Sequence, residues 1–219
     1  MSDLLAEQKR YYAERAPEYD DWWFRRGQFA LEPDALARWE SDVAEAESAL
    51  EAFGQRGRIL ELAAGTGLWT RHLVRHAGRL VAIDASPQTL ALNRARVDDR
   101  VEYVVADLFA WEPEAEFDLV FFSFWLSHVP EERFDSFWRT VRAALSPGGR
   151  VFLVDSGPKK EPTDDQRQVR QLADGREFTI VKRYWSPQEL GDRVRPLGFE
   201  LDLGVTRHDN FLVGGGGLA

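Results

Sequence analysis

Apolar and polar positions follow two alternating rhythms through the middle of the chain. Five short apolar runs have the length and composition of β-strands, and they lie at residues 58–62, 79–86, 101–107, 117–126 and 150–156. Three segments between them carry apolar residues at helical spacing, at residues 66–77, 86–96 and 130–145. This alternation predicts a parallel sheet wound on both faces by helices.

Both ends of the chain depart from this rhythm. Residues 3–16 and 32–53 predict two helices before the first strand. Residues 169–185 predict two extended stretches around an Asp-Gly turn. The C-terminal part predicts a helix and two strands, and the glycines at 214–217 predict a flexible end.

Composition and charge narrow the class of protein. The chain has 219 residues, enough for one α/β domain, and it has no cysteine, which excludes disulfides, thiolate catalysis and cysteine-based zinc sites. No metal site is expected. A formal charge of −9 disfavours nucleic acid as a partner. There is no apolar run long enough to span a membrane and no signal-peptide pattern, so we expect a cytoplasmic monomer or homodimer.

A glycine turn follows the first predicted strand, in the sequence "RILELAAGTGLWTRHL" at residues 58–73. Such a turn lets a ligand approach the backbone. A phosphate loop would need Gly-Lys-Ser/Thr, which is absent, and a dinucleotide site would need a third glycine where Leu68 or Trp69 stands. Asp84 and Asp107 end the second and third strands. A carboxylate at the position of Asp84 can accept both hydroxyls of a ribose, so the sequence favours a nucleoside without phosphates.

Several motifs together resemble the class I S-adenosylmethionine (SAM)-dependent methyltransferases. They are "ELAAGTG" (61–67), Asp84, "VVADLF" (104–109), "FDLVFFSFWLSHVP" (117–130) and "LSPGGRVFLVD" (145–155). The resemblance implies an α/β, Rossmann-like, doubly wound sheet of seven strands, mostly parallel, with an antiparallel last strand. It also implies SAM as the cofactor and S-adenosylhomocysteine (SAH) as the product.

The resemblance divides the chain and assigns roles to its residues. One methyltransferase domain over residues 1–219 is expected, with an N-terminal helical lid (1–54), a cofactor-binding core (55–155), a cap insertion after the fifth strand (156–185) and a C-terminal helix and strand pair (186–219). Gly65 and Gly67 would approach the methionine part of SAM, and Asp84 would bind the ribose. The other expected cofactor contacts are Tyr12, Tyr19, Glu61, Ala63, Ala85, Asp107, Leu108, Phe109, Ser123 and Phe124.

His128 and Asp155 are the candidate catalytic residues, at the ends of the fourth and fifth strands. His128 can take a proton near neutral pH. Asp155 can hold His128, bind an amine or only cap its loop. A methyl group on a sulfonium is already activated, so a base is not obligatory and alignment alone supplies much of the rate.

An aromatic-rich composition suggests the acceptor. Candidate substrate contacts are Trp22, Trp23, Trp125, Tyr184 and Trp185. They indicate methyl transfer to O or N of a small aromatic or heteroaromatic molecule. Alternatives are a C-methyltransferase of the quinone-biosynthesis type, a modifier of RNA or protein, an NAD-dependent reductase, and a cofactor-binding protein without transfer activity.

Overall fold

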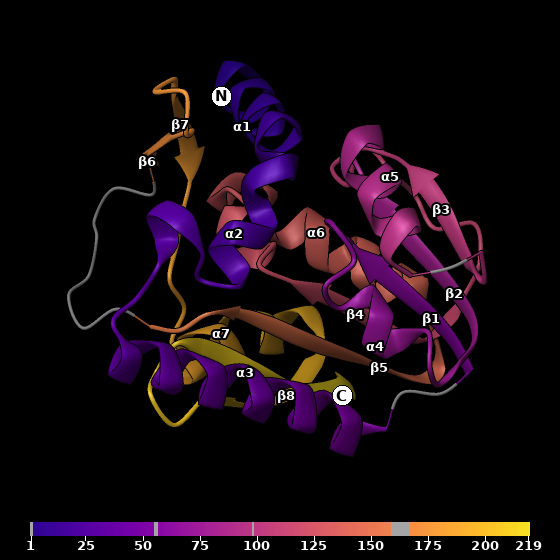
Figure 1. Cartoon of the computed structure of the whole chain (residues 1–219). Helices are drawn as coiled ribbons and strands as arrows, with labels where there is room; N and C mark the ends of the chain where they lie inside the picture. Colours follow the sequence, from indigo (N-terminus) through magenta and orange to yellow (C-terminus); the bar gives the residue numbers. More distant parts are fainter. Residues whose placement is uncertain (1, 55–56, 98, 159–166) are drawn as a thin grey trace.

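A twisted seven-stranded sheet organises the protein. The computed structural model describes residues 2–54, 57–97, 99–158 and 167–219, and its main sheet has the order β3-β2-β1-β4-β5-β9-β8 (Figure 1). The strands are β1 (Gly57–Leu62), β2 (Ala77–Asp84), β3 (Val101–Val105), β4 (Phe117–Ser123), β5 (Leu145–Ser156), β8 (Phe199–Val205) and β9 (Phe211–Leu218). Strands β1 to β5 pair in parallel, and β9 pairs antiparallel with both β5 and β8. The expected mostly parallel sheet with an antiparallel last strand is confirmed.

Helices cover both faces of this sheet. On one face lie α3 (Pro33–Phe53), α4 (Thr70–Leu73) and α5 (Pro87–Arg96), and on the other lie α6 (Glu131–Ala144) and α7 (Pro187–Val194). Successive residues of each central strand therefore enter different cores. Ile59 packs toward α3 and its neighbours, whereas Leu60 packs toward α6. A strand buried on both sides needs the continuous apolar sequence seen here.

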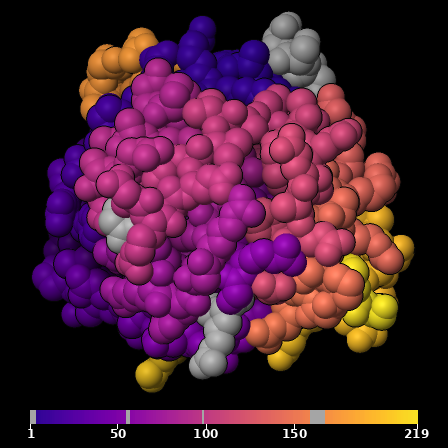
Figure 2. All heavy atoms as spheres, turned by 90° about the vertical axis from the view of Figure 1, so that its right-hand side faces the viewer, coloured from indigo at the N-terminus to yellow at the C-terminus, as the bar shows by residue number. Residues whose placement is uncertain are grey.

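The N-terminal segment and the cap lie together above the sheet. The segment contains α1 (Ser2–Arg15), η1 (Ala16–Glu18), α2 (Tyr19–Trp23) and η2 (Gly27–Phe29), and the cap is the antiparallel hairpin of β6 (Arg167–Gln171) and β7 (Glu177–Val181). Short 3-10 turns also occur at η3 (Leu126–His128) and η4 (Arg195–Leu197). Figure 2 shows the N-terminal segment in indigo beside the orange hairpin at the top of the molecule.

Helix α1 is held against the open edge of β7. A small apolar cluster of Tyr11, Leu172, Phe178 and Ile180 joins the two elements. The backbone N–H of Thr179 donates to Glu7 Oε1 at 2.8 Å, and that of Val181 donates to Gln8 Oε1 at 2.8 Å. The helix side chains thus satisfy alternate donors of a strand that has no neighbour on that side.

Two expectations about local structure are wrong. The predicted helix at 66–77 is only the four residues of α4, because the preceding turn is long: Ala63, Gly65 and Gly67 all have left-handed φ angles of 52°, 58° and 89°. The glycines at 214–217 are not a flexible end but lie inside β9. A Cβ on Gly216 would stand 1.9 Å from the Glu200 carbonyl oxygen, so this strand needs glycine to fit beside β8.

Asp42 anchors helix α3 to the turn between β8 and β9. It is fully buried and accepts hydrogen bonds from the Thr206 hydroxyl (2.8 Å), the Asn210 side-chain amide (2.8 Å) and the backbone N–H groups of His208 and Asn210 (3.1 Å each). One carboxylate therefore orders the whole connection.

We expect Asp42→Ala to lower the free energy of unfolding by about 2–4 kcal/mol, because several buried donors lose a charged acceptor. Urea denaturation measures this change. Glu40→Ala, an exposed position on the same helix, serves as the control and should stay within about 0.5 kcal/mol of the wild type. An equal loss in both variants would show that Asp42 has no special role.

Candidate active site

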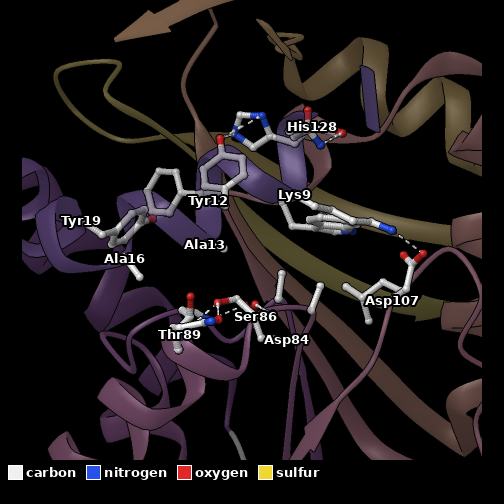
Figure 3. Close-up of a pocket in the computed structure, with 18 of the residues that line it drawn as sticks. Lys9, Tyr12, Ala13, Ala16, Tyr19, Asp84, Ser86, Thr89, Asp107 and His128 are labelled. Atoms are coloured by element: carbon white, nitrogen blue, oxygen red, sulfur yellow. Dashed lines mark hydrogen bonds and ion pairs between the residues drawn. The ribbon is translucent and has the colours of Figure 1, made fainter. Parts of the chain in front are cut away.

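A cavity of about 340 Å³ lies between α1 and the carboxyl ends of the parallel strands. Its floor comes from the residues after β1, β2, β3 and β4, and its roof from one face of α1 (Figure 3). Ligands of doubly wound sheets bind at this edge. Among the expected cofactor residues, all except Glu61 and Gly67 line the cavity, and so do His128 and Trp125.

The glycine turn forms one side of the floor. Gly65 lines the cavity, and a Cβ there would meet nothing closer than 3.9 Å, but its left-handed φ favours glycine. Gly67 has a different role from the one expected. A Cβ on it would lie 2.7 Å from Asn93 Oδ1, so Gly67 lets the turn pack against α5 and does not face the cavity.

Asp84 stands at the end of β2 with its carboxylate in the turn. Oδ2 accepts a hydrogen bond from the Gly65 N–H at 3.0 Å, and Oδ1 accepts one from the Ser86 N–H at 2.9 Å. Burial raises the pKa of Asp84, and the backbone N–H groups of Ser86, Gly65 and Ala85 oppose that rise. A carboxylate has about four acceptor positions, so Asp84 keeps capacity for a ligand's hydroxyl groups.

Glu61 lies directly beneath the turn and does not line the cavity. Burial raises its pKa to about 8, although the nearby Thr70 hydroxyl moderates the rise. Among the described residues, no hydrogen bond of ordinary geometry reaches either carboxyl oxygen. A buried group of this kind normally has a partner, such as a bound water or ligand.

The far end of the cavity is aromatic and carries one ion pair. Phe109 and Trp125 stand with ring centroids 5.3 Å apart, next to Leu108. Lys9 of α1 pairs with Asp107 Oδ2 at 2.5 Å and so spans the cavity from roof to floor (Figure 3). The buried Trp125 indole N–H has no partner within the described part of the chain. An adenine ring would find both stacking surfaces and hydrogen-bonding groups here.

His128 faces the cavity opposite the glycine turn. Its Nδ1 lies 2.6 Å from the Val181 carbonyl oxygen, which can only accept, so Nδ1 carries the proton. Its Nε2 then accepts the hydrogen bond from the Tyr12 hydroxyl at 2.8 Å (Figure 3). Burial, followed by the charge of Lys182, holds the pKa of His128 well below its usual range. The ring is therefore neutral at neutral pH.

Asp155 does not touch the His128 ring. It is buried and accepts hydrogen bonds from the backbone N–H groups of Ser127 (2.9 Å) and Ser156 (2.7 Å), and it lies 3.9 Å from Lys182 Nζ. Asp155 thus holds the loop that carries His128, while the Val181 carbonyl orients the ring. Asp155 therefore holds the backbone beside His128, through the N–H of Ser127, and does not hold the His128 ring.

The expected aromatic substrate contacts separate into two groups. Trp125 lines the cavity. Trp22 does not line it but packs edge-to-face on Phe124, which does. Trp23 and Trp185 lie instead in the two hydrophobic cores, where they contact Trp39 and Phe134 respectively. Tyr184 also lies away from the cavity lining, beside Lys182. Burial of the Trp23 and Trp185 rings in the cores stabilises the fold, so these two side chains do not face a ligand.

Several cavity residues escaped the sequence analysis. Leu5, Lys9, Ala13 and Ala16 line the roof with the expected Tyr12, at the three- and four-residue spacing of one helix face, a signal that was present in the sequence. Gln8 also lines the cavity and shares this spacing. Lys182 does not line the cavity and carries no such signal, because it is distant in sequence from Ser127, to which it donates. In the described part of the chain, no cluster of His, Asp or Glu is arranged to hold a metal, and no helix is long and apolar enough to cross a membrane.

We expect Glu61 to contribute a loss of stability as the pH rises from about 4.5 to about 8, because the folded protein keeps the proton of this carboxyl over the interval whereas the unfolded chain loses it. Glu61→Gln has no carboxyl to ionise. The free energy of unfolding of this variant, minus that of the wild type, should therefore increase with pH, by ~1.4 kcal/mol per pKa unit. Urea titrations at about pH 5 and about pH 8.5 measure it. Glu116→Gln, an exposed change, is the control. A constant difference between Glu61→Gln and wild type at both pH values would contradict the assignment.

The residues present fit SAM. Asp84 offers acceptors for ribose hydroxyls, Gly65 leaves the backbone open, and the aromatic end suits an adenine. The unpartnered Glu61 carboxyl and Trp125 N–H are polar groups that such a ligand or its water can satisfy.

Comparisons with known proteins agree with this geometry. The sequence matches the model of the methyltransferase domain over residues 59–149. The fold superposes on the DhpI–SAM–HEP complex with a TM-score of 0.85 and 38% identity, covering 97% of this chain and 96% of that one. For the DhpI–SAH complex, the TM-score is 0.80 and the identity 39%, over 98% and 97% of the two chains.

A curated relative, the demethylmenaquinone methyltransferase of Clavibacter sepedonicus, is 40% identical over 103 residues, which are 45% of this chain and 40% of that protein. The chain spans about two-fifths of the length of the first curated relatives that it matches. The likeness to DhpI, in contrast, extends over nearly the whole of both chains. With this identity, the methyltransferase-domain match and a cavity that fits SAM, the chain belongs to the class I SAM-dependent methyltransferases.

Proposed function

We propose that the protein transfers a methyl group from SAM to an oxygen atom of a small acceptor that carries an acidic group. The observation that supports this proposal is a set of cations around His128, in a chain whose formal charge is −9. These cations do not line the cavity themselves, but charge of the opposite sign to the rest of the protein, acting on a residue that does line it, attracts an anionic ligand.

Three cations act on His128. Lys182, Arg170 and Arg15 each lower its pKa, in that order. Lys182 is buried, and its Nζ donates to Ser127 Oγ (2.8 Å) and Ser156 Oγ (2.7 Å). These hydroxyls position the ammonium, and the buried carboxylate of Asp155 forms an ion pair with it at 3.9 Å.

The two arginines have little compensating charge. The Arg15 guanidinium lies over the rings of Tyr11, Tyr19 and Trp22, and the Arg170 guanidinium donates to Gln168. Within the described residues, neither has a carboxylate at salt-bridge distance. An oxyanion beside them would gain charge-assisted hydrogen bonds.

Arg25 adds to the excess of positive charge. Burial, and then the charge of Arg15, lower the pKa of Arg25 to about 10. Its buried Nε has no hydrogen-bond partner in the described part of the chain, and its guanidinium lies 3.4 Å from the centre of the Trp39 ring. Two partly buried guanidinium groups that repel each other favour an anion in their vicinity.

The acidic group of the acceptor would also prepare His128. SAM supplies a methyl group that is already activated on its sulfonium. A bound oxyanion offsets the field of Lys182, Arg170 and Arg15, so the pKa of His128 rises toward its usual range. Its Nε2 can then take the proton of the accepting oxygen as the new carbon–oxygen bond forms.

An aromatic acceptor has less support. Trp23 and Trp185 pack in the cores, and the rings that do line the cavity, Phe109 and Trp125, stand at the end with Asp107 where adenine is expected. Transfer to a carbon of a quinone-type acceptor would make no use of the cations; the name of the Clavibacter relative, demethylmenaquinone methyltransferase, is the reason to test it. Both remain outcomes of the acceptor screen.

The screen uses SAM with a labelled methyl group and two sets of small molecules: phosphonic, phosphoric and carboxylic acids, and phenols, azoles, amines and quinols that carry no such acid group. We expect label only in the acids. Lys182→Met and the less buried Arg170→Gln should raise KM for the acid by about tenfold or more, the worth of one charge-assisted hydrogen bond. The affinity for SAH should stay within about twofold.

Arg133→Gln, an exposed change on α6, is the matched control and should leave KM unaltered. Label only in acceptors without an acid group would overturn the proposal. Label in no molecule of either set would favour a cofactor-binding protein.

The ribose assignment has its own test. Asp84→Asn should weaken SAH binding by about 10- to 100-fold in calorimetry, because hydrogen bonds to a charged acceptor are lost. Asp118→Asn is the control: this carboxylate accepts from Arg58 N at 2.7 Å, at the opposite end of the sheet. Unchanged affinity in Asp84→Asn would refute the assignment.

A further inference from the structure

We propose that Gln8 is a positioning residue that fixes which ring nitrogen of His128 carries the proton. The inference rests on the proposed function in that it gives His128 a chemical role. It goes beyond that function by assigning the control of His128 to the lid helix α1, from which Gln8 reaches the site.

Gln8 makes two hydrogen bonds that fix its own orientation. It is buried, its Nε2 donates to the His128 carbonyl oxygen at 3.1 Å, and its Oε1 accepts from the Val181 N–H at 2.8 Å. One partner is only an acceptor and the other only a donor, so the amide cannot be reversed without losing both bonds. The side chain thus joins the backbone of His128 to that of Val181.

These are the two residues whose own contact sets the tautomer. The Val181 carbonyl accepts from His128 Nδ1 at 2.6 Å, and the N–H and carbonyl of one strand residue point to the same side. Gln8 and the His128 ring therefore share the open edge of β7. The bond from Gln8 fixes the N–H of Val181, and the extended backbone of that residue then directs its carbonyl to the same side, toward Nδ1.

The same helix controls the other ring nitrogen. Tyr12 follows Gln8 by four residues, one helical turn later, and its hydroxyl lies 2.8 Å from His128 Nε2. With Nδ1 protonated, Nε2 is an acceptor toward the cavity. If the tautomer reversed, Nε2 would become a donor and could not take a proton from an acceptor oxygen. Docking of α1 thus prepares His128 for chemistry.

The test is a long-range proton–nitrogen NMR spectrum of the whole protein with bound SAH, which distinguishes a bare ring nitrogen from a protonated one. The chain has four histidines, and the signal that disappears in His128→Gln assigns His128. We expect the wild type to show Nδ1 protonated. In Gln8→Met, the population of the reverse tautomer should rise by about two- to tenfold, the equivalent of one net hydrogen bond.

Glu7→Met is the matched control, because Glu7 caps the same edge of β7 through Thr179 without touching His128. It should leave the His128 signals unchanged, and Tyr12→Phe should keep Nδ1 protonated. SAH calorimetry and thermal unfolding verify that each variant folds. Unchanged signals in a folded Gln8→Met, or an equal shift in Glu7→Met, would overturn the inference.

The spectrum requires no acceptor, so this test is independent of the acceptor screen. If His128→Gln retained the full rate on an acceptor found in the screen, the base role of His128 would fail. The effect of Gln8 on the tautomer could still stand. If instead the tautomer ignored Gln8 while His128→Gln lost activity, only the present inference would fail.

Discussion

The edge of β7 is the constraint on which the active site depends. A two-stranded hairpin leaves one row of backbone groups unpaired, and here α1 and the loop of His128 satisfy that row together. Docking against this edge holds α1 over the ends of the parallel strands, where it roofs the cavity. The Lys9–Asp107 pair and the bond from Thr66 to Asp20 fasten the same segment to the core. A chain of side-chain contacts thus closes the site.

The distribution of charge gives the cavity its chemical character. The protein as a whole is acidic, yet Arg15, Arg170 and Lys182 act on the ring of His128, and Arg25 acts on Arg15. Aromatic rings lie against Arg15 and Arg25, whereas two serine hydroxyls and the carboxylate of Asp155 hold Lys182. Glu61 and Asp84 lie across the cavity at the glycine turn. The site therefore has a carboxylate side beneath the expected methionine and ribose of SAM, and a cationic side where the acceptor would lie.

Much of the cofactor side was predictable because it depends on a local rule. Parallel strands end at one edge of the sheet, so Asp84, Asp107 and Ser123 had to meet near the glycine turn. The rule does not say which way each residue faces. Gly67 turns toward Asn93, and Glu61 lies beneath the floor, because the long left-handed turn rotates the backbone between them. The direction of Trp23 and Trp185 could not be predicted either, because each of these side chains packs in one of the two hydrophobic cores and not toward the cavity.

The sequence by itself determined the β-α order and the cofactor edge, because these follow from the spacing of apolar residues and from the residues at strand ends, and the motifs shared with the methyltransferases implied the antiparallel last strand. Only the tertiary structure decided the surroundings of His128. Gln8, Tyr12 and Val181 are more than fifty residues away from it along the chain and meet it only when α1, η3 and β7 pack together. The orientation of a buried ring depends on the donors and acceptors within about 3 Å of it, and no pattern along the chain encodes that set.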